Sequence, residues 1–149
     1  MMQKRQRGLT LVELMVVVAV MAIIATIAYP IYTNQVQKTR RADAKVVLES
    51  VAMAEERFYT INGSYTDDYT ELFTGTLAIA AGLDWPCTDG DTCNTSRGYY
   101  VIDIGHGTDD QDFTVTADAS SSGPQAGDTA CPSFTINHQG VKTPASGCW

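Results

Sequence analysis

The sequence predicts an α+β protein in which one long N-terminal helix packs on an antiparallel sheet of three or four strands. Apolar residues dominate positions 9–32 and then recur at helical spacing as far as Ile61. After residue 98, apolar and polar residues alternate instead. A helical part followed by a run of strands is typical of the α+β class. The 149 residues are enough for one domain with a modest core.

The first element combines a basic start with a long apolar segment. Three basic residues in the first seven positions precede the stretch from Leu9 to Tyr32, in which Glu13 is the only charged residue. A helix of these 24 residues is ~36 Å long, enough to cross the hydrocarbon of a bilayer. Basic flanking residues stay in the cytoplasm, so the rest of the chain is expected on the other side. A carboxylate inside such a segment suggests a function, because it is costly without a partner.

Three interpretations of this segment compete. It could be a plain membrane anchor, or a secretory signal that is cut after its apolar core. The small residues Ala25 and Ala28 fit the second interpretation, but the apolar run is long for a signal and Tyr29-Pro30 follows it. The third is a cut before the run, between Gly8 and Leu9. That cut would keep the helix on the mature protein, with Glu13 as its fifth residue.

The stretch Gly8-Leu9-Thr10-Leu11-Val12-Glu13 resembles the processing motif of type IV prepilins, which also requires a basic leader and a long apolar helix. The resemblance implies that a prepilin peptidase removes residues 1–8 and that the new amine of Leu9 is methylated. It also implies that Glu13 pairs with the amine of a neighbouring subunit, and that Pro30 matches the proline of the family's membrane helix. Residues 9–32 would then form the membrane and filament-core helix, and residues 33–149 a periplasmic or extracellular head.

The helix is expected to continue beyond the apolar segment as an amphipathic helix. Apolar residues at steps of three and four lie on one helical face: Ala44, Val47, Val51, Ala54, Phe58 and Ile61. We expect this face to pack on the sheet of the same chain. Pro30 removes one backbone hydrogen bond and is expected to kink the helix. Asn62-Gly63 predicts its end, because glycine tolerates the left-handed conformation common there.

The rest of the sequence divides into a long connection and a set of strands. Residues 64–97 are expected to form the connection, held to the helix by Tyr65, Tyr69, Leu72 and Phe73. Within it, Leu77–Ala81 is a short apolar piece that could be helix or strand. Alternation predicts strands at 99–104, 113–118 and 133–137, with a short return strand at 141–142. These are the three or four strands of the predicted sheet.

Four cysteines, Cys87, Cys93, Cys131 and Cys148, allow three disulfide pairings. We favour the two short loops, Cys87–Cys93 and Cys131–Cys148, because both surround turn-rich stretches. The alternative is a metal site, but the spacings match no common zinc pattern. We therefore expect no metal and no cofactor. The segment Cys131-Pro132-Ser133-Phe134-Thr135-Ile136, together with Cys148-Trp149, is similar to the last strands and closing disulfide of the pilin family.

No catalytic arrangement stands out, so an enzyme is not expected. His106 and His138 are interpreted as loop residues, since no nucleophile motif lies near either. The cluster Asp109, Asp110 and Asp112 could bind Ca²⁺, which prefers grouped oxygen ligands. It fits no EF-hand spacing, and a solvated turn is the preferred interpretation.

The mature chain is strongly acidic. After residues 1–8, seven basic and 17 acidic residues remain, so the net charge is −10. Nucleic acid is therefore not expected as a direct ligand, because its binding depends on cations that displace counterions from phosphate. One basic cluster exists, formed by Lys38, Arg40, Arg41 and Lys45. We expect it to meet acidic groups of neighbouring subunits, with DNA contact as the alternative.

The stretch Glu56 to Thr66 resembles the helix end and following loop of minor pilins of the PilE type. The resemblance implies a structural subunit of a type IV pilus, most simply a minor pilin, serving pilus assembly, twitching motility, adhesion or DNA uptake. The expected partners are other pilins, the prepilin peptidase and the assembly platform. The subunit would wait in the inner membrane as a single-pass protein before entering an extracellular fibre. A type II secretion pseudopilin and a DNA-binding competence pilin are the alternatives.

Overall fold

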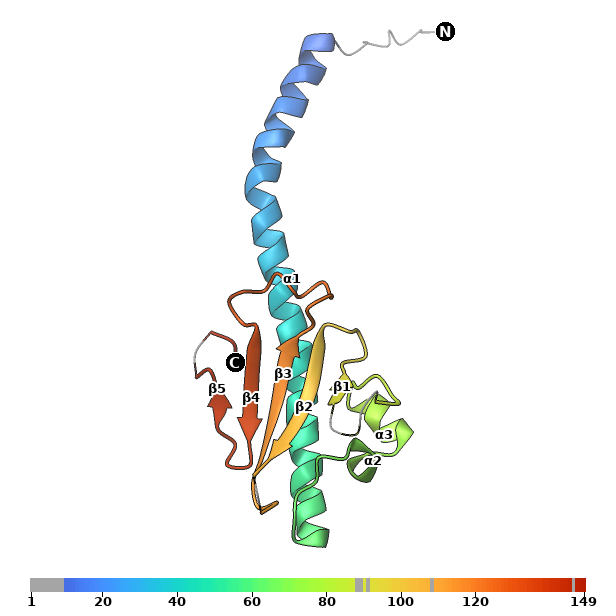
Figure 1. Ribbon diagram of the computed structural model, residues 1–149. Coiled ribbons are helices and arrows are strands. Elements are labelled where there is room, and N and C mark those ends of the chain that lie inside the picture. Colours follow the sequence, from blue (N-terminus) through green and yellow to red (C-terminus); the bar gives the residue numbers. More distant parts are fainter. Residues whose placement is uncertain (1–9, 88–89, 91, 108, 146) are drawn as a thin grey trace, which may run out of the picture. The chain divides into compact units, whose positions relative to one another are not determined.

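A computed structural model describes residues 10–149 of the chain, apart from residues 88, 89, 91, 108 and 146 (Figure 1). The elements follow one another as α1 (Leu11–Asn62), α2 (Tyr69–Leu72), α3 (Gly75–Ala80), β1 (Thr92–Asn94), β2 (Tyr100–His106), β3 (Phe113–Ala119), β4 (Ser133–Asn137) and β5 (Lys142–Thr143). The chain divides into two compact units, Met1–Val36 and Gln37–Trp149. We call the second unit the head.

Helix α1 has 52 residues and continues through Pro30. It ends where the sequence predicts, because Gly63 follows with a φ of 79° and its N–H donates to the carbonyl of Tyr59 at 2.8 Å. This left-handed glycine satisfies one of the carbonyls that a helix end leaves free. The kink at Pro30 stays a prediction.

The part of α1 in the first unit is apolar and exposed. Within α1, an 18-residue window has a mean hydropathy of 2.7, and none of it is buried in the chain. Leu11, Ile24 and Ile31 are examples, with 74%, 59% and 64% of their surface exposed. By length and composition, this helix is able to cross a membrane.

The rest of α1 lies along one face of the sheet (Figure 1). Most of the predicted apolar face is confirmed, since Ala44, Val47, Val51 and Ala54 are buried in the core and Phe58 packs against it. Leu48 joins them and is fully buried. Ile61 is the exception. It lies in the last turn of α1, where the core does not reach, and is 76% exposed.

The sheet is an antiparallel meander in the order β1-β2-β3-β4-β5. The central pair, β2 and β3, runs in register from Tyr100 opposite Ala119 to His106 opposite Phe113. The alternation predicted for the strands is confirmed: the buried positions Tyr100, Ile102, Ile104, Phe113, Val115, Ala117, Phe134 and Ile136 fall on every second residue. The α+β class is thus confirmed. The sheet has five strands because β1, which the sequence analysis did not predict, pairs with β2.

The connection between α1 and the sheet carries two short helices beside β1 (Figure 1). The ambiguous piece at 77–81 belongs mainly to α3. The four residues expected to hold the connection, Tyr65, Tyr69, Leu72 and Phe73, are all buried. Tyr65 stacks on Tyr59 of α1 with ring centroids 4.5 Å apart. Tyr69 instead reaches the sheet, where its hydroxyl donates to the carbonyl of Ile102 at 3.2 Å.

Two disulfides close loops in the head. Cys87 is joined to Cys93, and Cys131 to Cys148. These are the two short-loop pairings that the sequence analysis favoured. The first links β1 to the segment before it, and the second links Cys148 to the loop that leads into β4.

Candidate functional site

Glu13, the charged residue of the apolar segment, forms hydrogen bonds within the first turn of α1. Glu13 Oε2 accepts hydrogen bonds from the backbone N–H and the hydroxyl of Thr10, at 3.0 and 2.9 Å. In return, Thr10 Oγ1 accepts from the backbone N–H of Glu13 at 3.2 Å. This reciprocal pair is a capping box, which stabilises a helix start. The spacing Thr10-x-x-Glu13 is the sequence signature of this motif, which we did not predict from the sequence.

The other residues that the resemblance assigns to processing and assembly are not gathered into one site. Gly8 and Leu9 lie outside the described residues. Pro30 lies inside α1, and its carbonyl accepts a hydrogen bond from the hydroxyl of Thr33 at 3.0 Å. Side-chain donors of this kind bond to carbonyls of the preceding turn. The roles of these residues therefore stay predictions.

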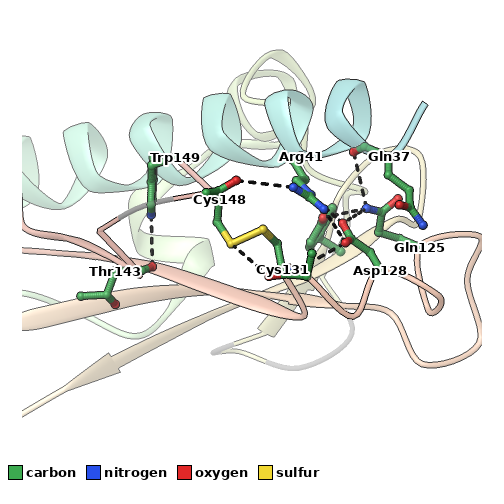
Figure 2. The surroundings of a disulfide bond; sticks show 11 residues. Gln37, Arg41, Gln125, Asp128, Cys131, Thr143, Cys148 and Trp149 are labelled. Carbon is green, nitrogen blue, oxygen red and sulfur yellow. Dashed lines mark hydrogen bonds and ion pairs between the residues drawn. A yellow bond between two sulfur atoms is a disulfide. The ribbon is translucent and has the colours of Figure 1, made fainter. Parts of the chain in front are cut away.

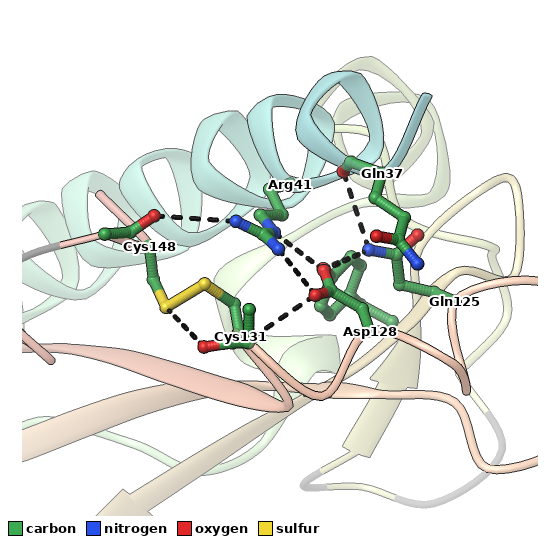
Figure 3. A network of polar contacts seen from close by, with 9 residues as sticks. Gln37, Arg41, Gln125, Asp128, Cys131 and Cys148 are labelled. Atoms are coloured by element: carbon green, nitrogen blue, oxygen red, sulfur yellow. Dashed lines mark hydrogen bonds and ion pairs between the residues drawn. A yellow bond between two sulfur atoms is a disulfide. The ribbon is translucent and has the colours of Figure 1, made fainter. Parts of the chain in front are cut away.

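A buried ion pair ties α1 to the loop before β4 (Figures 2 and 3). Arg41 Nε donates to Asp128 Oδ2 at 2.6 Å, and Arg41 Nη2 donates to Asp128 Oδ1 at 2.5 Å. Their side chains are only 11% and 1% exposed. The geometry is bidentate, which is the strongest way for a guanidinium to hold a carboxylate. Arg41 was expected to meet acidic groups of a neighbouring subunit, but its carboxylate partner is Asp128 of the same chain.

Neighbouring groups complete the ring of donors around Asp128. Gln125 Nε2 donates to its Oδ2 at 2.6 Å, and the backbone N–H of Cys131 donates to its Oδ1 at 3.3 Å. The same Gln125 amide reaches the hydroxyl of Tyr100 at 3.1 Å. Figure 3 shows how this network sits beside the disulfide between Cys131 and Cys148. One polar cluster therefore joins α1, β2 and the closing loop.

Arg41 and Asp128 each shift the pKa of the other group. Burial pushes the pKa of the Asp128 carboxyl upward, but hydrogen bonds and the positive charge of Arg41 outweigh it, so the pKa lies below its ordinary value. The hydrogen bond from Arg41 to Asp128 raises the pKa of the guanidinium. Both groups therefore stay charged around neutral pH. The cluster is a structural clamp, since its polar groups are turned inward on one another.

A second arginine of the predicted basic cluster lines a hollow on the head. Arg40 donates to the carbonyl of Pro124 at 2.7 Å and lies 4.7 Å from the ring centroid of Tyr99. Arg97 also lines this hollow, which has a volume of about 210 Å³. Arg97 pairs with Asp43 at 2.7 Å. The hollow thus brings together two guanidinium groups and an aromatic ring, the kinds of side chain that contact nucleic acid backbones and bases.

His106 and the acidic residues Asp109, Asp110 and Asp112 lie at the end of β2 and in the turn that follows it. His106 ends β2, and its Nδ1 lies 3.5 Å from Asp110 Oδ1. Asp112 Oδ1 accepts from the backbone N–H of Gly107 at 2.5 Å. Across the described parts of the chain, three or more His, Cys, Asp or Glu side chains do not gather in a geometry that could hold a metal ion.

The sequence of this chain matches the sequence models of two known families. The sequence model described as "Type IV minor pilin ComP, DNA uptake sequence receptor" matches residues 30–135. The chain belongs to this family of type IV minor pilins. A second model, the prokaryotic N-terminal methylation motif, matches residues 3–29 of the pilin. The two matches are adjacent and together cover residues 3–135, which include α1, β1, β2, β3 and the first three residues of β4.

Individual relatives of this pilin are pilins as well. The type IV major pilin protein PilA of Myxococcus xanthus is 35% identical over 68 residues, 46% of this chain and 31% of that protein. A type IV major pilin protein PilE1 of Neisseria gonorrhoeae is 28% identical over 122 residues, 82% of this chain and 57% of that protein. The chain thus spans about a third to three fifths of the length of these relatives. A solved type IV pilin from Shewanella oneidensis aligns with a TM-score of 0.49 at 24% identity, over 76% of this chain and 97% of that one.

Proposed function

We propose that this pilin is a structural, non-enzymatic subunit of a type IV pilus, present as a minor component. The observation that carries the proposal is the tandem of a methylation-motif match at 3–29 and a minor-pilin match at 30–135. The structure supplies the parts that such a subunit needs. One is an exposed apolar helix for burial in a membrane or a fibre, and the other is a head with its own core.

Glu13 would set the register of the subunit during assembly. Removal of residues 1–8 by a prepilin peptidase would leave a positive amine at Leu9, which the carboxylate of a neighbouring subunit could pair with. Glu13 Oε2 is engaged by Thr10, but a carboxylate has about four acceptor positions on two oxygens. It can therefore close its own helix and receive an amine as well. A misplaced subunit would leave both charges unpaired in an apolar bundle, which is unfavourable.

Surface fibres sheared from cells test this proposal. We expect an immunoblot to detect the pilin in the sheared fraction of wild-type cells, and to detect it only in the inner membrane of a strain that lacks the assembly ATPase. An inner-membrane marker protein must be absent from the sheared fraction. Retention of the pilin in the membrane of wild-type cells, together with a defect in protein export when it is deleted, would instead favour a secretion pseudopilin.

A second candidate function, receiving DNA during uptake, follows from the description of the matching family. The net charge of −10 that remains after removal of residues 1–8 argues against DNA as a direct ligand. If DNA binds, the hollow beside Arg40, Arg97 and Tyr99 is the site best suited to it. Arg97 and its partner Asp43 are 64% and 41% exposed, so their pair is weak and a phosphate could replace the carboxylate.

A binding experiment with labelled DNA and the mature pilin in detergent micelles tests whether DNA binds at this hollow or does not bind directly. Binding at this hollow should weaken with salt with a logarithmic slope of about −2, as expected for two or three phosphate contacts. Arg97→Ala should lower the affinity, whereas Arg57→Ala, which removes an exposed cation elsewhere on the head, should leave it unchanged. Equal affinity of the wild type and Arg97→Ala at low salt would exclude this hollow as the site.

A further inference from the structure

Two exposed tyrosines mark the end of the apolar segment of α1. Tyr29 and Tyr32 are 72% and 69% exposed, and the first residues of the head follow them in the same helix. Tyrosine is enriched at the interface between the hydrocarbon and the headgroups of a membrane. The turns of α1 that follow Tyr32 are therefore the ones that would meet the headgroups.

The hollow lined by Arg40, Arg97 and Tyr99 lies a short way along the chain from this interface. Arg40 is the eighth residue after Tyr32, and both belong to α1. Eight residues of helix span about 12 Å. The headgroup layer on each side of the hydrocarbon is about 5 to 8 Å thick, and long basic side chains near the end of a membrane helix extend to it. The cations of the hollow are thus within reach of phosphate groups at the membrane surface.

The hollow offers both apolar surface and positive charge. Ala44, Val47 and Ala81 contribute apolar surface, and the first two are buried in the core. The guanidinium of Arg97 is 64% exposed, and the ring of Tyr99 lies on the same hollow. A phospholipid carries a charged phosphate next to apolar ester and acyl groups. It can therefore use both kinds of surface, which a bare anion cannot.

Positive charge dominates around the hollow, although the chain as a whole is acidic. Asp43 is the only carboxylate among the described residues that line it. The pair of Asp43 with Arg97 is exposed on both sides and therefore weak. Lys38, Arg40 and Lys45 lie within about two turns of α1, and none of them forms an ion pair in the part of the chain that the structure describes. The local field therefore attracts an anion.

Strand β2 separates this surface from an acidic end of the head. Tyr100 at the start of β2 lines the hollow, whereas Asp109, Asp110 and Asp112 lie in the turn that follows its last residue, His106. Figure 1 shows β2 running along the length of the sheet. The seven residues of the strand separate its two ends by about 20 Å, more than twice the ~8 Å over which physiological salt screens charges. The acidic turn therefore does not prevent the hollow from meeting an anionic surface.

We propose that this hollow binds the phosphate of an anionic phospholipid headgroup while the pilin waits in the inner membrane. Arg97 exchanges its exposed contact with Asp43 for the phosphate, and Arg40 adds a second positive charge beside Tyr99. The inference rests on the proposed function, because it requires the membrane-anchored state that precedes assembly. DNA carries phosphate as well, but the position of the hollow just beyond the apolar segment of α1 favours lipid.

Native mass spectrometry tests this site with the mature pilin in micelles that contain equal amounts of phosphatidylglycerol and phosphatidylcholine with the same acyl chains. The mature form is used because the three basic residues among residues 1–8 would bind anionic lipid themselves. We expect phosphatidylglycerol to be retained about fivefold or more over phosphatidylcholine, since one cation near a membrane surface favours anionic lipid by about that factor. Equal retention of the two lipids would overturn the proposal.

Three variants show whether the lipid preference arises at the hollow. Arg97→Gln should reduce it about fivefold, and Asp43→Asn, which removes the competing carboxylate, should increase it. Arg57→Gln removes an exposed cation of α1 that lies 25 residues beyond Tyr32, and it should leave the preference unchanged. Equal losses in Arg97→Gln and Arg57→Gln would show that net charge alone sets the preference, which contradicts a site at the hollow.

DNA is the competing occupant of the hollow. If Arg97→Gln abolishes DNA binding and leaves the lipid preference unchanged, the lipid site is wrong. The lipid experiment is also separate from the pilus role. A pilin that enters sheared fibres but retains both lipids equally contradicts only the lipid site. A pilin that prefers phosphatidylglycerol but never enters fibres supports the lipid site and contradicts only the proposed role in a pilus.

Discussion

Replacing Asp128 with alanine is expected to destabilise the head by about 3 kcal/mol or more, because it leaves the guanidinium of Arg41 buried without a counter-charge. Arg41 and Asp128 are 11% and 1% exposed in the folded protein. The substitution also removes the acceptor for Gln125 and for the backbone N–H of Cys131. Urea unfolding of the mature pilin in micelles, followed by circular dichroism, measures the change in the free energy of unfolding.

Two further variants test whether the buried pair contributes more to stability than an exposed ion pair does. Asp43→Ala removes the partner of Arg97 in an exposed pair, and it should cost no more than about 1 kcal/mol. The double variant Arg41→Met/Asp128→Leu replaces the buried pair with apolar side chains and should be more stable than Asp128→Ala alone. Equal losses for Asp128→Ala and Asp43→Ala would show that the clamp adds nothing beyond a surface pair.

Glu13→Gln is expected to reduce incorporation of the pilin into sheared fibres at least about tenfold. Glutamine can still accept the two hydrogen bonds from Thr10 that begin α1. It has no negative charge for the amine of a neighbouring subunit, so that amine would be left alone in the apolar bundle, at a cost of several kcal/mol. The ratio of this pilin to the dominant pilin in sheared fibres measures the effect.

Thr10→Ala is the matched control for this experiment. It removes the Oγ1 acceptor of the capping box and leaves the charge of Glu13 in place. A lost helix cap costs about 1 kcal/mol, so incorporation should fall only slightly. A loss in Thr10→Ala as large as that in Glu13→Gln would show that Glu13 acts mainly by starting its own helix.

The main elements of the fold could be predicted because their signals are local. The apolar run, the helical spacing of Ala44 to Ala54 and the alternation in β2 to β4 each depend on neighbouring residues. Strand β1 has only three residues and lies between turn-forming residues, so it has no periodicity to recognise. It is a strand because β2 offers a free edge for it to pair with.

The polar clusters could not be predicted, because their partners are distant in the sequence. Arg41 and Asp128 are separated by 87 residues, and Arg41 belongs to a run of basic residues that suggests a solvated surface. Its burial becomes evident only when the loop before β4 is folded onto α1. In the sequence, Glu55 lies between a residue of the apolar face and the charged residues Glu56 and Arg57. This position gave no indication that Glu55 is buried. The capping box at Thr10 and Glu13 is different, since its spacing was available in the sequence.

Quantitative mass spectrometry of sheared surface fibres tests the central claim most directly. If the pilin is a processed fibre subunit, its N-terminal peptide begins at Leu9, carries one N-methyl group and is present at a small fraction of the dominant pilin. A peptide that still begins at Met1, found in membranes and absent from fibres, would contradict the claim.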